Sequence, residues 1–454
     1  MTLFPMGFLE CNTTEALLGL EVFYTDTPGT KGRLKRDLED FVVDEISRHP
    51  PEDPSGRYTI AKVTSTNWET NRLVRQLARQ LGMSRNRISF AGTKDKRAVT
   101  SQLMCFEAPL EDVLGLRMHQ VVVEGAYRSR KNLTIGDLIG NSFKIKVRDC
   151  ALTGEELRSA AAATIGRLGS LGGFPNFFGV QRFGSLRPIT HIVGRHIVRG
   201  EFEEACLAYA AKPVPEESEG AKKARQFIQE TRDYPAALRL LPRHLMFERI
   251  VVEHLAKEPE DYAGAIRALP RNLQMMFVHA YQAFMFNRML SERVRRGLPL
   301  DAPVVGDIVL PMDKHGLPDH DKPVPVTKHN LDLVASQVGN RRASVSAVLF
   351  GSESVLCEGE PGEIERSIIE REGVSKGDFI VPIIPECSST GSRRELVAEF
   401  HDLGYQAADD SLEMSFSLGK GCYATCLLRE VMKADMIEAD RATYLQAAEE
   451  PAGQ

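Results

Sequence analysis

Short apolar runs separated by polar turns dominate the first 150 residues, a pattern typical of the strands of a sheet. Their β-branched and aromatic content predicts strands at 33–46, 57–64, 87–90, 98–106, 119–124 and 141–148. One helix is predicted between the second and third of these, because leucines recur at helical spacing up to Leu81. Thr66 and Glu69 have the spacing of a capping box at its start, and Gly82 suits its end.

The pattern changes near residue 200, where long amphipathic helices are predicted at 201–211, 220–231, 244–256 and 272–296. A proline-rich stretch and an acidic segment follow. A strand is predicted again at 413–418, and a helix follows it up to Lys433. Because a pattern typical of strands returns near the end of the chain, we expect an α+β chain in which one domain is interrupted by a mainly helical insert.

Composition narrows the class of protein. The 454 residues are 43% hydrophobic and 26% charged, which excludes a mainly disordered or fibrous chain. No apolar run approaches the roughly 18 residues of a membrane span, and no basic residue precedes Lys31 as a secretory signal would require. We therefore expect a soluble, cytoplasmic protein. Eight scattered cysteines without a CxxC, and histidines without an HExxH, imply neither a disulfide framework nor a metal.

Charge is unevenly distributed along the chain. The net charge is −5, yet residues 71–102 hold eight basic residues and one acidic residue. Further basic stretches lie at 126–148 and 182–199, and residues 352–373 carry seven glutamates against two arginines. Such a chain can bind a polyanion on one face and repel it elsewhere. The alternative, that the basic residues form ordinary solvated helix faces, is left open by charge alone.

The segment AGTKDKRAVTSQ (91–102) concentrates candidate chemistry. Asp95 stands between Lys94 and Lys96, with Arg97 next, on a predicted loop between two strands. Adjacent cations favour the ionised carboxylate, which could act as a nucleophile or a base. A charged surface turn is the competing interpretation.

A second cluster, NFFGVQRFGSLRPITHIVG (176–194), interleaves phenylalanines with amide and guanidinium groups. Flat rings beside such groups suit stacking on an exposed base and reading of its edge. Two core aromatics beside a turn would give the same pattern. Phosphate-loop interpretations fail, because no GxxxxGK[ST] occurs and the GxGxxA match at Gly419, Gly421 and Ala424 leaves too little chain for a dinucleotide-binding half.

These segments carry a resemblance to a known family. AGTKDKRAVTSQ closely resembles the signature of the TruD family of pseudouridine synthases, and NFFGVQRFGSLRP (176–188) resembles that family's second motif. Four further segments resemble family motifs in the same order: LKRDLEDFVVDEI (34–46), GDLIGNSFKIKVR (136–148), AYQAFMFN (280–287) and GKGCYATCLLREVMK (419–433). The chain is long for the family and resembles its archaeal and eukaryotic branch.

The resemblance implies a fold and a set of site residues. It implies a pseudouridine-synthase catalytic domain at 1–199 and 393–454, with a mixed, mainly antiparallel sheet flanked by helices, and a mainly helical TruD-type insertion domain at 200–392. Family members act on uridine 13 of tRNA without a metal or an organic cofactor. Asp95 matches the family nucleophile. The residues that match positions close to the substrate are Lys94, Asn176, Phe178, Tyr423, Phe41 and Glu45.

The chemistry agrees with these residue types. The uridine must be flipped out of its stack and held while detached, which calls for aromatic faces and an amide. The cations expected to hold RNA are Arg72, Arg75, Arg79, Lys96, Arg97 and Arg182. The resemblance implies tRNA as the partner. It implies no membrane, metal or protein partner. The rival hypotheses are a catalytically silent RNA-binding or RNA-chaperone protein on the same fold, and a cofactor-dependent nucleotide enzyme suggested by Gly419 and Gly421.

Overall fold

The computed structural model describes residues 7–442 except 216, 315 and 440. The chain divides into two compact units, which are described one at a time. The sheet unit comprises residues 27–173 and 398–434, and the helical unit comprises residues 7–26, 174–397 and 435–441. Chain segments far apart in sequence therefore share each unit, as expected for one domain interrupted by another.

The sheet unit is built on one eight-stranded sheet. Its strands are β3 (Phe41–Ser47), β4 (Tyr58–Thr66), β5 (Ile88–Phe90), β6 (Val99–Phe106), β7 (Val121–Ser129), β8 (Leu138–Val147), β15 (Phe400–Ala408) and β16 (Ser411–Gly419). The order is β15-β16-β8-β3-β6-β4-β7, and β5 pairs with β6. Among the described strand pairs of this sheet, only β3 and β6 run parallel. The expected mixed, mainly antiparallel sheet is confirmed.

The single parallel pair positions the candidate site. Val42 of β3 lies opposite Val99 of β6, so both strands begin at the same end of the sheet. The chain that enters β3 and the loop that enters β6 therefore arrive side by side. Lys35 lies on the first of these segments and Asp95 on the second.

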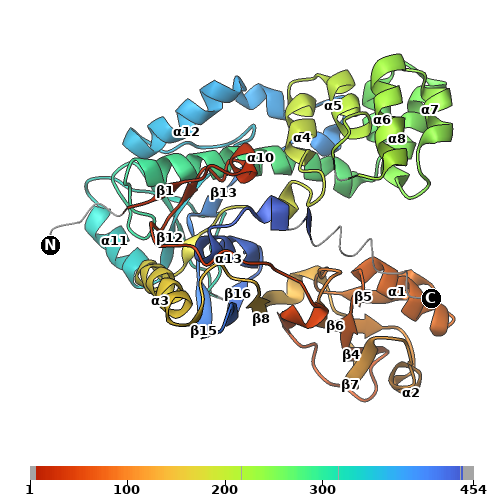
Figure 1. Cartoon of the computed structure of the whole chain (residues 1–454), viewed down its shortest axis with the longest axis horizontal. Coiled ribbons are helices and arrows are strands. Elements are labelled where there is room, and N and C mark those ends of the chain that lie inside the picture. The colour runs from red at the N-terminus through yellow and green to blue at the C-terminus, as the bar shows by residue number, and fades with distance from the viewer. Residues whose placement is uncertain (1–6, 216, 315, 440, 443–454) are drawn as a thin grey trace. The chain divides into compact units, whose positions relative to one another are not determined.

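Helices pack on this sheet: α1 (Thr70–Gln80), α2 (Leu110–Leu114), α3 (Gly154–Leu171) and α13 (Ala424–Met432) (Figure 1). α1 buries Leu73 and Leu77 against Val63 and Phe106 of the sheet. Each buried leucine contributes about 1.5–3 kcal/mol, so this apolar stripe fixes which face of α1 turns outward.

The structure corrects two local predictions. The strand predicted from residue 33 begins only at Phe41, because Lys35 has a positive φ of 54° and a 3₁₀ turn occupies Leu38–Asp40. The predicted capping box is wrong: Thr66 ends β4, and Glu69 itself caps α1, its carboxylate accepting from the Asn71 and Arg72 amides. The prediction for the helix end is confirmed, since Gly82 has φ +60° just after α1.

The helical unit is built around its long helix α10 (Arg271–Arg295), which packs on α4 and α12 (Figure 1). The other helices are α4 (Thr190–Val198), α5 (Phe202–Ala210), α6 (Glu219–Thr231), α7 (Tyr234–Leu240), α8 (Met246–Lys257), α9 (Tyr262–Arg267), α11 (Leu331–Gly339) and α12 (Gly359–Glu372). The four long helices predicted in this region are confirmed as α5, α6, α8 and α10.

Small sheets complete the helical unit. β10 (Ile308–Pro311), β11 (Val324–Pro325), β12 (Ala343–Leu349) and β13 (Ser392–Glu395) form a sheet in the order β11-β10-β12-β13, and β1 (Leu9–Glu10) pairs with β2 (Val22–Phe23). The remaining short strands are β9 (Phe174–Pro175) and β14 (Val397–Ala398). Among the described residues, no helix combines the length and the apolar character that crossing a membrane requires. The expected domain boundaries at 199/200 and 392/393 stay a prediction, because a compact unit does not define a family domain.

Candidate active site

Asp95 lies on the loop at 91–97 that joins β5 to β6, as the sequence predicted. Its side chain is 46% exposed, and one carboxylate oxygen lies 3.0 Å from the Nζ of Lys35. Lys35 is largely buried, with its ammonium 4.3 Å from the centre of the Phe41 ring. An exposed carboxylate is thus held in one direction by a cation that is itself packed on an aromatic face.

Lys94, the residue before Asp95, has a different ion-pair partner. Its side chain is buried and pairs with the buried carboxylate of Glu45 on β3. Glu45 also accepts from the Ser47 hydroxyl at 2.7 Å and from the Leu103 amide at 3.4 Å. The backbone amide of Lys94 donates to the Thr70 hydroxyl at the start of α1. These contacts tie the loop to both β3 and α1.

Arg97 fixes the loop on the other side of Asp95. It is buried, and its guanidinium donates to the backbone oxygens of Lys35 and Arg36 at 2.9 Å each. The loop at 91–97 therefore contacts Lys35 twice: Arg97 binds its backbone carbonyl, and Asp95 binds its side-chain ammonium. This arrangement leaves Asp95 and Lys96 exposed between two buried cations.

The exposed face of α1 carries Arg72, Arg75 and Arg79, all turned to solvent. The guanidinium of Arg72 lies 5.5 Å from the centre of the Trp68 ring. Tyr423 is half-buried and occupies the N-cap position of α13 in the same unit. The predicted cationic face is therefore present, and whether it binds RNA stays a prediction.

Asn176, Phe178 and Arg182 belong to the helical unit, where they form a cluster around Arg394. The Arg394 guanidinium donates to the Asn176 side-chain oxygen at 2.5 Å and lies 4.1 Å from the centre of the Phe178 ring. The Arg182 guanidinium lies 5.7 Å from the same ring. Phe178 is only 8% exposed.

Asn287 holds this cluster on α10. Its side chain accepts from the Phe178 amide at 2.8 Å and donates to the Phe178 carbonyl at 3.0 Å, so both backbone groups of Phe178 are fixed. Asn287 is fully buried and donates as well to the Leu18 carbonyl at 3.1 Å. A buried amide whose two N–H groups both donate and whose oxygen accepts gives the cluster one well-defined geometry.

Lys35, Arg394 and Asn287 were not identified as site residues from the sequence. Lys35 and Asp95 are 60 positions apart, and Arg394 and Asn176 are 218 apart, so neither pair leaves a local pattern. Asn287 did leave a signal, because it is a polar residue in the apolar run AFMFN of a core helix. Buried amides are kept where they satisfy backbone groups.

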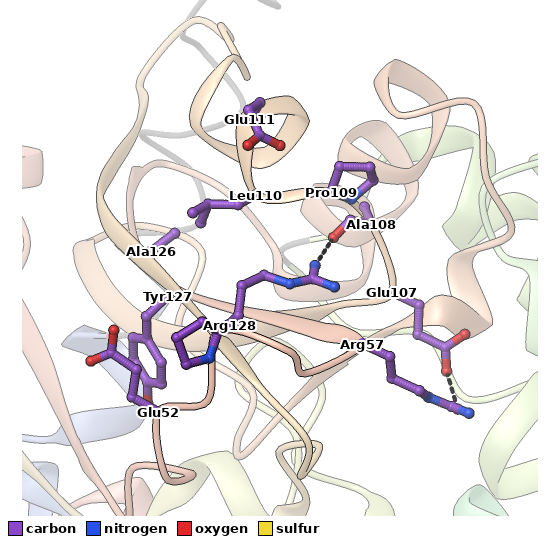
Figure 2. A pocket seen from close by; sticks show the side chains of 11 residues that line it. Glu52, Arg57, Glu107, Ala108, Pro109, Leu110, Glu111, Ala126, Tyr127 and Arg128 are labelled. Atoms are coloured by element: carbon purple, nitrogen blue, oxygen red, sulfur yellow. Dashed lines mark hydrogen bonds and ion pairs between the residues drawn. The ribbon is translucent and has the colours of Figure 1, made fainter.

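A hollow of the sheet unit lies away from Asp95. It has a volume of about 660 Å³ and is lined by Arg57, Glu107, Tyr127 and Arg128 among others (Figure 2). Glu107 follows the last residue of the eight-residue strand β6, whereas Asp95 precedes its first. The two sites therefore lie at opposite ends of a strand roughly 26 Å long. In this hollow Arg57 pairs with Glu107 at 3.1 Å and Arg128 donates to the Ala108 carbonyl at 2.7 Å. Because the hollow is remote from Asp95, we assign it no part in the chemistry.

Comparison with known proteins identifies the family. The family model described as tRNA pseudouridine synthase D (TruD) matches residues 17–431. A protein of Methanococcoides burtonii named a probable tRNA pseudouridine synthase D is 43% identical, over 93% of this chain and 98% of its own. A relative from Halobacterium salinarum with the same name is 38% identical, over 93% of this chain and 98% of its own. The crystal structure of a Methanosarcina mazei protein that carries the TruD name matches with a TM-score of 0.82 at 40% identity, covering 93% of this chain and 98% of that one. The chain therefore belongs to the TruD family of tRNA pseudouridine synthases.

Proposed function

We infer that this chain converts uridine to pseudouridine in tRNA, at position 13, with Asp95 as the catalytic residue. Membership of the family supports the reaction and the substrate class. The observation that carries the role of Asp95 is its geometry, an exposed carboxylate aimed by the buried Lys35 at 3.0 Å. In this proposal the sheet unit forms most of the catalytic domain expected at 1–199 and 393–454, although residues 174–199 of that domain belong to the helical unit together with the insertion expected at 200–392.

The reaction requires few chemical groups from the protein. The N1–C1′ bond breaks, the base turns, and a C5–C1′ bond forms, while C5 loses a proton and N1 gains one. In one route an Asp95 oxygen bonds to C1′ as N1 leaves with its electron pair, and C5 later displaces the carboxylate. In the other, Asp95 takes the 2′ proton as N1 leaves and returns it when C5 bonds to C1′. Both routes require the same exposed carboxylate at the sugar.

The residues around Asp95 act as positioning groups in this proposal. Lys35 fixes the direction of the carboxylate, and Phe41 supports Lys35. Glu45 acts through Lys94, since its own oxygens are already engaged. Arg97 holds the Lys35 segment, which favours a positioning role over the phosphate contact expected from its charge. Lys96 and Arg182 remain proposed RNA contacts, and Tyr423 a proposed base contact.

The test is incubation of the purified protein with unmodified tRNA transcript, followed by mapping of pseudouridine. We expect one new pseudouridine, at position 13. A transcript with cytidine at that position is the control and should gain none. Tight binding without conversion would contradict the proposal and favour the alternative of a silent RNA-binding protein.

Phe178 tests how the aromatic cluster is used. If its ring stacks on the flipped base, Phe178→Ala should slow single-turnover isomerisation by about one to two orders of magnitude, since stacking contributes roughly 1–3 kcal/mol. Phe178→Tyr should be nearly normal. Phe286 is the matched control, because its ring packs edge-on against Phe178 at 5.6 Å and is fully buried. Phe286→Ala should lower stability by about 3–5 kcal/mol. A Phe178→Ala protein with a similar stability loss and a normal rate per folded molecule would assign Phe178 to the core.

The arginines of α1 test the phosphate contacts. Replacing Arg72, Arg75 and Arg79 by Ala should weaken binding of all tRNAs alike and reduce the salt slope of binding by about one unit per contact. The slope is measured from affinities over a range of salt concentrations. Arg158→Ala is the control, because this exposed arginine on α3 pairs with Glu155. An unchanged slope in the triple variant would place the RNA elsewhere.

A further inference from the structure

We infer that the helical unit carries a second RNA-binding surface, formed where α7 ends and α8 begins. This α7–α8 surface consists of the exposed residues Arg239, Leu240, Arg243, His244, Met246 and Phe247. The two helices are packed on each other, and Figure 1 shows them as neighbours at one end of the unit. The inference rests on the proposed function, because it takes tRNA as the ligand.

The backbone beneath this surface is fixed. Arg249 donates to the carbonyls of Leu238 and Leu241 at 2.9 and 2.8 Å, and the Leu241 side chain is buried in the core of the unit. The Leu245 amide donates to the Pro242 carbonyl at 3.1 Å. The connection at 241–245 is therefore a braced turn, and its outward side chains are presented from a rigid base. Little backbone ordering would be needed on binding.

The exposed groups have the composition of a nucleic-acid contact. Residues 234–247 contain two arginines and one histidine but no acidic residue. In the described part of the chain neither Arg239 nor Arg243 has an ion-pair partner. Leu240, Met246 and Phe247 are 50%, 61% and 40% exposed, an unusual density of large apolar groups on so short a segment. Guanidinium groups bind phosphates, and an exposed ring offers a stacking face for an unpaired base.

The charge of the α7–α8 surface differs from that of α12. The chain carries a net charge of −5, and α12 exposes Glu360, Glu363 and Glu370. α12 also exposes Arg366 and Arg371, so its exposed charges nearly balance, whereas the α7–α8 surface exposes two arginines and no acidic residue and attracts a polyanion. We commit to single-stranded nucleotides of the substrate tRNA as the occupant, because phosphates complement the arginines and an unpaired base complements Phe247.

The test compares charge and ring variants by two independent readouts. Filter binding of full-length tRNA transcript over a salt series gives affinity and salt slope, and single-turnover kinetics give KM and the saturating rate. Arg239→Ala/Arg243→Ala should weaken binding roughly tenfold per contact near 0.1 M salt and reduce the slope by about two units. The saturating rate should be unchanged. The control Arg371→Ala/Lys376→Ala removes the same charge from exposed positions on and just after α12 and should leave both values as in the parent.

The ring variants separate stacking from apolar docking. Phe247→Ala and Phe247→Leu should both weaken binding about five- to a hundredfold, whereas Phe247→Tyr should bind as the parent does. If Leu substitutes fully, or if the variants change the oligomeric state in sedimentation while RNA affinity stays constant, the surface is a protein interface and the inference is overturned. A parent protein that binds tRNA but forms no pseudouridine would overturn the proposed function, and filter binding would still decide the role of this surface.

Discussion

The Asp95→Asn protein is expected to form no measurable pseudouridine, a loss of at least about four orders of magnitude in single-turnover rate, while its tRNA affinity changes less than about threefold. An amide can neither bond to C1′ as a carboxylate does nor take the 2′ proton, whereas binding is distributed over many phosphate contacts. Asn retains a side-chain oxygen for Lys35 Nζ, which lies 3.0 Å from the Asp95 carboxylate. The fold should therefore be kept, because an ion pair with a half-exposed partner contributes at most about 1 kcal/mol.

Asp149→Asn is the matched control for this result. Asp149 is another partly exposed carboxylate of the sheet unit, paired with Arg36 at 2.9 Å. Its amide variant should isomerise uridine at the parental rate. Substantial turnover by Asp95→Asn, or an equal loss in Asp149→Asn, would show that the chemistry does not depend on the Asp95 carboxylate. The two proteins are compared at saturating tRNA, so a change in affinity cannot be mistaken for a change in the chemical step.

The sequence was most informative where a single segment carries the information. The Asp95 loop was predicted because its residue types, its flanking strands and the family resemblance all fall within 91–102. The long helices of the helical unit followed from apolar periodicity. The acidic segment, by contrast, did not predict α12, because its glutamates mask a short apolar stripe that includes Ile364 and Ile368.

The rest of the site depends on contacts between distant segments. Lys35 reaches Asp95 only because β3 and β6 run parallel and because Lys35 takes a left-handed backbone conformation, which is uncommon for lysine. The strand pattern at 33–46 pointed to extended backbone there and concealed the turn. The contacts of Arg97 likewise involve a distant segment of the chain and could not be predicted from the sequence. Its charge suggested RNA, and the structure instead gives its guanidinium two backbone carbonyls to bind.

The buried Lys94–Glu45 pair of the sheet unit should be costly to break. Both side chains are almost fully buried, and the Glu45 carboxylate has no access to water. Lys94→Met would leave that carboxylate buried with only the Ser47 and Leu103 donors, so we expect a loss of about 3–5 kcal/mol in the free energy of unfolding. Isomerisation should fall as well, because Lys94 anchors the residue next to Asp95. Denaturant unfolding and single-turnover kinetics on the same preparation measure both effects.

A double-mutant cycle assigns the loss to the unpaired charge. Lys94→Met/Glu45→Leu removes both charges and should recover most of the stability, because an apolar pair of similar volume replaces a buried ion pair at little cost. Lys62 and Asp44 are the matched control: they join neighbouring regions of the same sheet at 3.2 Å but are 40% and 53% exposed. Lys62→Met should cost less than about 1 kcal/mol. If Lys94→Met costs no more than Lys62→Met, the buried pair does not hold the loop. If the double variant recovers stability but not activity, the pair is needed to aim Asp95 rather than to keep the sheet folded.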